Sequence, residues 1–251
     1  YNINGSFDVD EYYLDNDLNG FSTSYYPNNK PSFVYRYDHS WLMGWEQYDS
    51  SGKLLSTANF PAGKGAYETR HFNGNVMVRA AYEAYQLHGK YESFYYNGKP
   101  RLSMQYRYGK SYDSAITRYF NGKIESRGLM VNNEKHGKWL YYFEDGKLRE
   151  SELNKHGELH GENIFYRPDG SIEKSTEYKE GSSHGNTNLY NTAGELMIQI
   201  HYQNGFAISY SYTGKDGKLV PAISINAVKD SAVGYYKNGV KSAVFHFENE
   251  D

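Results

Sequence analysis

A glycine that recurs every 24 residues limits this chain to a repeat architecture. It ends a turn that usually contains tyrosine, and five successive turns read YYNG, YFNG, YFEDG, YRPDG and YNTAG, ending at Gly98, Gly122, Gly146, Gly170 and Gly194. The register continues upstream at Gly52 and Gly74 and downstream at Gly217 and Gly239, with spacings that slip to 22 or 23 residues. One short structural unit is therefore repeated along the whole chain.

Two further columns of turn residues run through the repeats. One holds Gly20, Gly44, Gly65, Gly89, Gly137, Gly161 and Gly185, and the other holds Gly109, Asn133, Gly157, Gly181 and Gly205. Residues 181–185 read GSSHG and match the G-x-S-x-G elbow of serine hydrolases. Both of these glycines belong to the columns, and Ser183 corresponds to Leu159 and Lys135 in the preceding repeats. We therefore predict a connector turn between strands, and no nucleophile at Ser183.

The segments between the turns alternate with a period of two. The second and eighth residues after the turn glycine are mostly apolar, whereas the fifth is mostly polar, as in Arg79, Ser151 and Gln199. This pattern is typical of half-buried strands. We predict an all-β fold: an elongated, single-layer antiparallel sheet of about ten consecutive β-hairpins with a 24-residue repeat. Leu148, Ile172 and Leu196 are expected to pack inward.

The domain organisation predicted from this pattern is one repeat domain, 1–251. Residues 1–20 form a partial first repeat. Residues 218–251 form an irregular last repeat or a cap, because Val220 and Pro221 interrupt the alternation and proline suits a strand edge or a bulge.

Composition excludes several classes of function. The formal net charge is −3, without the basic excess of a nucleic-acid-binding surface. The absence of cysteine excludes disulfides, thiolate zinc sites and cysteine nucleophiles. No apolar stretch approaches the ~20 residues of a membrane span, so we expect no membrane insertion. The chain opens on Tyr1 rather than Met, and we expect that a preceding segment was removed.

Two patterns suggest metal ligands and are weak. His88, His136, His160 and His184 form a column, but equivalent positions in successive hairpins are ~10 Å apart, too far to share one ion. Asp15, Asp17 and Asn19 match the start of a calcium loop, whose twelfth position is Tyr26 instead of Glu. We expect no metal and no cofactor, with calcium at the Asp15 turn as the minor alternative.

The repeat resembles a known family. HGKWLYYFEDGKL (136–148) and GENIFYRPDGSI (161–172) are similar to the bacterial variant of the MORN repeat, and the resemblance covers nearly the whole chain. It implies an elongated sheet of β-hairpins, a role in protein interaction or scaffolding, and no catalytic residues. Some bacterial relatives carry an antitoxin label, which implies neutralisation of a partner protein as an alternative. The expected location is exported or periplasmic, in a bacterium.

The predicted function is a non-enzymatic interaction or scaffold module that presents a tyrosine-rich sheet surface to an unknown protein partner. Tyrosine gives a large contact area at a low entropic cost. The candidate contacts are the eighth-position aromatics Phe60, Tyr82, Tyr106, Tyr178 and Tyr202, which could equally hold hairpin to hairpin. Two other functions stay open: glycan binding, with tyrosines stacked on sugar rings, and an enzyme hidden in the irregular segment 218–232.

Overall fold

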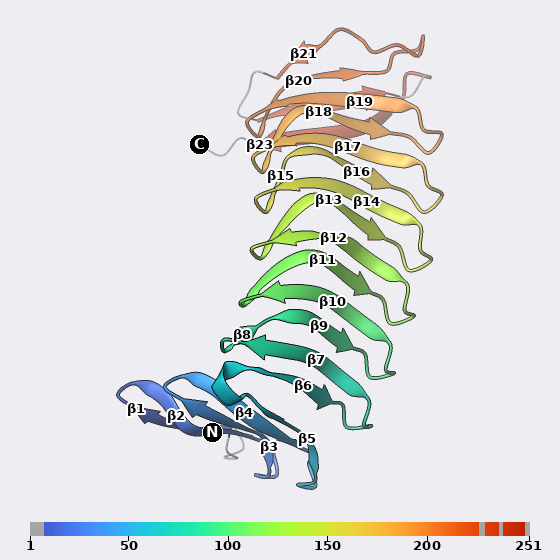
Figure 1. Ribbon diagram of the computed structural model, residues 1–251. Helices are drawn as coiled ribbons and strands as arrows, with labels where there is room; N and C mark the ends of the chain where they lie inside the picture. The colour runs from blue at the N-terminus through green and yellow to red at the C-terminus, as the bar shows by residue number, and fades with distance from the viewer. Residues whose placement is uncertain (1–7, 226–228, 236–237, 249–251) are drawn as a thin grey trace. The chain divides into compact units, whose positions relative to one another are not determined.

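The computed structural model describes residues 8–225, 229–235 and 238–248, which form antiparallel strands joined by short turns (Figure 1). The first sheet has five strands: β1 (Val9–Leu14), β2 (Asp17–Tyr25), β3 (Pro31–Asp38), β4 (Trp41–Tyr48) and β5 (Leu54–Asn59). The second sheet has 16 strands. They are β6 (Gly65–Arg70), β7 (Val76–Glu83), β8 (Gln86–Leu87), β9 (Gly89–Phe94), β10 (Pro100–Arg107), β11 (Lys110–Arg118), β12 (Ile124–Val131), β13 (Glu134–Tyr142), β14 (Leu148–Lys155), β15 (Glu158–Leu159), β16 (Gly161–Tyr166), β17 (Ile172–Lys179), β18 (Ser182–Tyr190), β19 (Leu196–Gln203), β20 (Phe206–Tyr212) and β21 (Ile223–Ser224). The third sheet pairs β22 (Lys229–Tyr235) with β23 (Lys241–Glu248).

The predicted fold class is confirmed: the protein is an all-β array of antiparallel hairpins, and its long second sheet is not closed. The array is divided into three sheets among the described residues, which the repeat pattern did not predict. Among these residues the one helical element is a three-residue 3₁₀ turn, η1 (Pro61–Gly63). No helix in the described part of the chain has the length and hydropathy needed to cross a membrane.

The chain divides into two compact units. Unit 1 comprises residues 1–123 and 130–133, and unit 2 comprises residues 124–129 and 134–251. Unit 1 holds the first sheet together with β6 to β11, and unit 2 holds β13 to β23. The single repeat domain remains a prediction, and part of the expected first repeat, residues 1–7, lies outside the described residues.

One kind of turn, the tip turn, contains the 24-residue glycine. At Gly98, φ is +79°, a left-handed conformation that most side chains avoid. The Gly98 N–H donates to Tyr95 O (2.8 Å), and the Tyr95 N–H donates to Lys99 O (2.8 Å). The Asn97 side-chain oxygen accepts the Lys99 N–H at 3.0 Å, which explains why Asn or Asp precedes glycine in most tips.

The other kind of turn joins hairpins through two residues that both have positive φ. Asn132 and Asn133 have φ of 52° and 73°, as in a type I′ turn. Glu180 and Gly181 repeat this geometry, and Ser183 then lies within β18, where its carbonyl accepts the Gly205 N–H at 2.9 Å. The turn at Glu180 and Gly181 therefore leads directly into β18, which begins at Ser182, and this confirms the predicted connector between strands. It excludes the elbow geometry at Ser183, in which a helix follows the serine.

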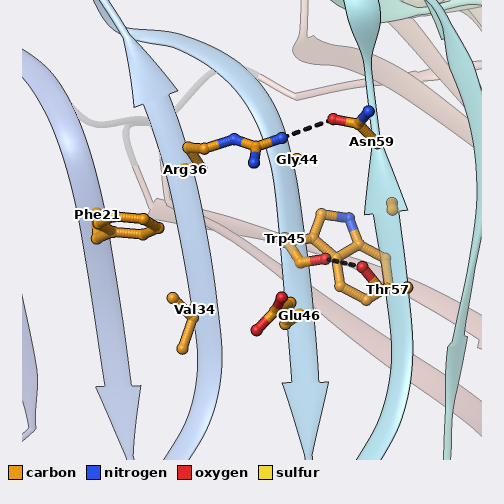
Figure 2. Close-up of a pocket in the computed structure, with 9 residues that line it drawn as sticks. Phe21, Val34, Arg36, Gly44, Trp45, Glu46, Thr57 and Asn59 are labelled. Atoms are coloured by element: carbon orange, nitrogen blue, oxygen red, sulfur yellow. Dashed lines mark hydrogen bonds between the residues drawn. The ribbon is translucent and has the colours of Figure 1, made fainter.

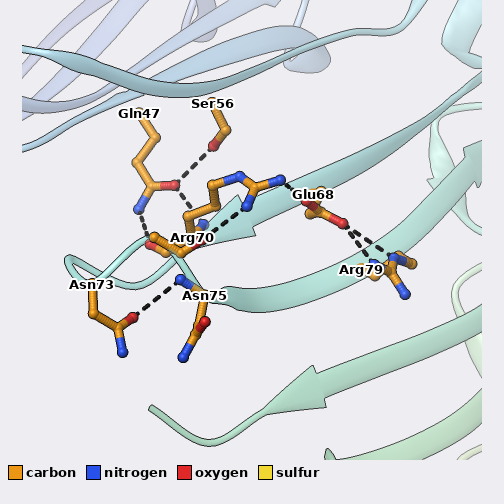
Figure 3. A network of polar contacts seen from close by, with 8 residues as sticks. Gln47, Ser56, Glu68, Arg70, Asn73, Asn75 and Arg79 are labelled. Carbon is orange, nitrogen blue, oxygen red and sulfur yellow. Dashed lines mark hydrogen bonds and ion pairs between the residues drawn. The ribbon is translucent and has the colours of Figure 1, made fainter. Parts of the chain in front are cut away.

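The first sheet ends because one connector is shortened. Four residues separate Phe60 from Gly65, whereas six separate Tyr82 from Gly89. Pro61 and η1 fill the shortened connector, and β5 does not pair with β6. Instead, the Gln47 side chain on β4 accepts the Arg70 N–H at 2.9 Å and donates to Arg70 O at 2.8 Å (Figure 3). A side-chain amide thus replaces one backbone pair between the sheets.

Each unit has its own hydrophobic cluster. In unit 1, Trp45, Ala58 and Phe60 are buried where the first sheet meets the start of the second. In unit 2, Ile198, Ile200 and Ala207 are buried together with Ala232 of β22. The last hairpin therefore packs on the sheet as a separate two-stranded element, and the irregular repeat or cap at 218–251 stays a prediction.

The expectation that the second-position residues pack inward is largely wrong. Leu54 is 49% exposed, and Leu148, Ile172 and Leu196 are half-buried. The buried aliphatic residues of that last repeat are Ile198 and Ile200, at the fourth and sixth positions. The strand register shifts beside each tip, as between Leu189 and Tyr190, so the second position lies next to the turn, where fewer strands cover it.

Candidate interaction surface

The candidate surface in unit 1 is a group of four half-buried tyrosines, here called the tyrosine face: Tyr67, Tyr82, Tyr91 and Tyr106. The register places these side chains on one side of β6, β7, β9 and β10. Ring centroids lie 5.8 Å apart both between Tyr67 and Tyr82 and between Tyr91 and Tyr106. Neighbouring strands thus assemble a partly exposed aromatic surface.

The hydroxyl groups of this surface lie in a poorly solvated environment. Burial raises the pKa of Tyr67, Tyr82 and Tyr106, and nearby tyrosines raise these values further. These three phenols therefore stay neutral at physiological pH and can donate hydrogen bonds to an incoming group. The tyrosine face can thus offer both ring area and donors to a partner.

Phe60 has a different role from its column neighbours. It is fully buried, and its ring lies 4.9 Å from Tyr82 and 6.1 Å from Tyr67. This placement assigns Phe60 to the hydrophobic cluster that packs against Tyr67 and Tyr82. Of the predicted contact residues in unit 1, Tyr82 and Tyr106 are therefore the two whose side chains are partly exposed.

In unit 2, Tyr178 and Tyr202 are also half-buried and lie opposite Gly161 and Gly185 on the neighbouring strands. Tyr202 packs against the Ile198 and Ile200 cluster, and burial, followed by the proximity of Tyr178, raises its pKa. Much of the Tyr202 ring therefore supports the core of unit 2. Whether Tyr178 contacts a partner stays a prediction.

Unit 2 also contains a buried polar cluster, defined as Lys135, Tyr141, Glu150, Glu152, Asn154 and Asn163. Its centre is Glu152, which is only 7% exposed. One Glu152 carboxylate oxygen accepts from Lys135 Nζ (2.9 Å), Tyr141 OH (2.6 Å) and Asn154 Nδ2 (3.0 Å). These hydrogen bonds replace the water that burial removes.

The cluster fixes protonation states. Burial alone would raise the pKa of Glu152, but the hydrogen bonds from Tyr141, Lys135 and Asn154 outweigh it and hold the pKa below its ordinary value. Burial and the bond to Glu152 raise the pKa of Tyr141. A charged carboxylate and a neutral phenol are thus the stable pair. Asn163 donates to Glu150 at 3.0 Å, and its own side-chain oxygen is buried without a partner.

The candidate metal residues are not assembled into a site. Asp15 and the adjacent Asn16 form a two-residue turn, whereas Asp17 and Asn19 lie in β2, with Asp17 accepting a hydrogen bond from Ser40 Oγ (3.0 Å). Among the residues that the structure describes, no group of three His, Cys, Asp or Glu side chains could hold an ion. His88 instead lies 3.4 Å from Glu83 and 4.8 Å, ring to ring, from Tyr108.

A hollow of about 230 Å³ opens on the first sheet where Gly44 lacks a side chain (Figure 2). A Cβ at Gly44 would approach Ala58 O to 2.5 Å, so glycine is required there. Arg36 crosses this hollow and donates to Asn59 Oδ1 at 2.6 Å. The arginine is thereby held in the hollow by Asn59.

Sequence reasoning missed the polar cluster, although a signal was present. The even positions of that repeat read Leu148, Glu150, Glu152 and Asn154, where other repeats are mostly apolar. Polar residues on a buried face indicate a hydrogen-bonded network.

The comparison with family models matches residues 87–108 and 135–153 to the MORN repeat variant, and the chain therefore carries repeats of this type. The matched segments contain Tyr91, Tyr106, Lys135, Tyr141 and Glu152. MORN repeats generally form protein- or membrane-binding modules and are typically non-catalytic. The comparison with curated proteins gives no match.

Proposed function

We propose that this chain of MORN-type repeats is a non-enzymatic interaction module that binds a protein partner through the tyrosine face. The observation that carries the proposal is the set of four half-buried tyrosines on adjacent strands of unit 1. Phe60 and Trp45 pack against Tyr67 and Tyr82 of this surface. Rigid aromatic side chains on a regular scaffold are typical of binding hot spots.

The test compares two tyrosines of the same hairpin. Tyr106 lies on the tyrosine face, whereas Tyr112, which is 42% exposed, projects from the other side of the sheet. A photo-crosslinking phenylalanine analogue at position 106 should capture a partner from the native source, whereas the same analogue at position 112 should not. With the captured partner purified, Tyr106→Ser should weaken binding by ~1 kcal/mol or more, about fivefold, and Tyr112→Ser should not.

Equal crosslinking at both positions, or unchanged affinity in Tyr106→Ser, would refute the tyrosine face as the site. Melting curves for both variants are the control, because a loss of folded protein would mimic a loss of binding. An antitoxin-like role predicts in addition that the captured partner is toxic to cells when it is expressed alone.

Glycan binding has a specific observation in its favour. Phe72, Tyr96 and Phe120 stand at equivalent tip positions and are 66%, 55% and 59% exposed. Successive tips are two strands apart, ~9.6 Å, so the three rings form a regular row on which sugar rings could stack. Affinity electrophoresis in soluble polysaccharides tests this alternative: Phe120→Ser should reduce any retardation, and Tyr106→Ser should not.

A further inference from the structure

A second binding site is indicated where the first sheet ends, within unit 1. A hollow of about 530 Å³ lies between β5 and β6, and its lining residues are Leu55, Ser56, Thr57, Ala66, Tyr67, Glu68, Arg70 and Arg79. The hollow differs from the tyrosine face in chemistry, because its lining includes three charged side chains, Glu68, Arg70 and Arg79.

The backbone edges that face this hollow are not used by either sheet. The Phe60 N–H donates to Met43 O at 2.8 Å, so the alternate residues Leu55 and Thr57 direct their backbone groups away from β4. On β6, Arg70 directs its backbone groups away from β7 and toward Gln47. By the same alternation, Ala66 and Glu68 also present backbone N–H and C=O groups outward.

Gln47 shows that the β6 edge accepts an amide partner. Its side-chain oxygen and nitrogen bind the Arg70 N–H and C=O at 2.9 and 2.8 Å, and Ser56 Oγ donates to the same side-chain oxygen at 2.9 Å (Figure 3). This pair of bonds is the pattern that a neighbouring strand makes. β6 is the edge strand of the second sheet, so the backbone groups of Ala66 and Glu68 that face away from β7 pair with no strand of either sheet. An extended peptide could form backbone hydrogen bonds with them.

Charge indicates what kind of peptide fits. Glu68 is shared by two guanidinium groups: Arg79 donates to it at 2.8 Å, and Arg70 forms the second ion pair. The charged side chains that line the hollow are therefore one carboxylate and two guanidinium groups, a net charge of +1. A carboxylate from outside would be favoured there, because arginine binds carboxylates with paired hydrogen bonds.

We propose that the hollow binds an extended, acidic peptide segment of a partner protein. The segment adds to the edge of β6 through backbone hydrogen bonds with Ala66 and Glu68, and it places an acidic side chain against Arg70 and Arg79. This site shares Tyr67 with the tyrosine face, but Arg70 and Arg79 are not part of that face, and their variants leave its four tyrosines in place.

The probe is a fluorescein-labelled octapeptide of alternating valine and glutamate, titrated into the whole chain and followed by fluorescence anisotropy. We expect saturable binding that Arg79→Ala weakens about tenfold, the usual scale of a lost charge-assisted hydrogen bond. Arg101→Ala is the matched control, because it removes an exposed arginine of β10, whose guanidinium lies over the Tyr95 ring. This variant should bind the peptide as the native chain does. Hydrogen exchange at the Ala66 and Glu68 amides should slow when the peptide is present.

A second peptide separates strand pairing from simple anion binding. Methylation of alternate backbone nitrogens keeps every carboxylate but removes the donors for the ladder, and this peptide should lose binding. Equal binding of the methylated peptide, complete displacement by inorganic phosphate, or no saturable binding at millimolar peptide would each overturn the proposal. Tyr106→Ser should bind the octapeptide normally, so this result is distinguishable from failure of the tyrosine-face proposal.

Discussion

The sixth and eighth positions after the tip glycine are filled in opposite ways in two repeats, the repeat after Gly52 in unit 1 and the repeat after Gly146 in unit 2. In unit 1 they are Ala58 and Phe60, which belong to a hydrophobic cluster. In unit 2 they are Glu152 and Asn154, which belong to a hydrogen-bonded cluster and are 7% and 5% exposed. The same backbone positions are therefore buried in both, by ring packing in one and by polar contacts in the other.

This difference teaches that the turns, and not the interior residues, specify the repeat. Both regions keep the left-handed tip glycines, Gly52 and Gly146, and the Asn or Asp side chain that caps the tip. With the hairpin fixed at its ends, the interior can be apolar or polar, provided that each buried polar group finds a partner. The two fillings should still respond differently to mutation and to pH.

The largest expected effect is in the apolar region. Phe60→Ala removes a fully buried ring, and we expect the free energy of unfolding to fall by ~3 to 5 kcal/mol, through lost burial and the cavity left behind. Urea unfolding monitored by circular dichroism measures the loss. Phe60→Leu is the control and should retain most of the stability. A loss below ~1 kcal/mol for Phe60→Ala would show that the cluster does not hold unit 1 together.

The polar region should show a smaller loss with a characteristic pH dependence. Glu152→Gln removes the charge that accepts from Lys135 and Tyr141, and we expect a cost of ~1 to 3 kcal/mol near neutral pH. Because folding lowers the pKa of Glu152, its contribution is present above the ordinary value of ~4.3 and is lost as the pH falls through the folded-state pKa.

The measurement is a series of urea unfolding curves for the native chain and Glu152→Gln between pH 7 and pH 3. The difference between the two should shrink as the pH falls. Glu150→Gln is the matched control and should cost less, because the Glu150 carboxylate accepts from the Asn163 amide and from neither Lys135 nor Tyr141. A constant difference across this range would contradict a charged, hydrogen-bonded Glu152.

The regular parts of the fold could be predicted from the sequence because they depend on local backbone chemistry. The columns at Gly98 and Asn133 predicted turns that the structure confirms, since both residues have positive φ. The third column lies in or beside strands instead, as Gly185 does in β18. The division of the sheet was not predicted. The shortened connector from Phe60 to Gly65 is visible as a 22-residue spacing, but its effect on strand pairing depends on non-local packing around Trp45.

The candidate site was predictable only in part, for a similar reason. Period-two alternation places Tyr82 and Phe60 in the same column, yet one is half-exposed and the other is fully buried. The difference arises because β5 ends the first sheet, and the two sheets enclose Phe60 between Trp45, Tyr67 and Tyr82. Alternation identifies a face but does not show which part of that face another sheet covers.

The smallest expected effect is at Ser183. It tests whether the side chain beside a connector turn can be exchanged without loss of stability, as the side chains inside the hairpins can. Ser183 is half-buried in β18, and its backbone pairs with Tyr178 and Gly205, whereas Gly181 and Gly185 carry the turn and the bulge. Ser183→Ala keeps the backbone bonds, so the free energy of unfolding should change by less than ~0.5 kcal/mol. Gly185→Ala is the control and should lower the free energy of unfolding by more, because Gly185 has a φ of +96° and an added Cβ would collide with Glu177. A large loss in Ser183→Ala, measured by the same urea curves, would mean that the side chain itself supports unit 2, and equivalence with Leu159 and Lys135 would then fail.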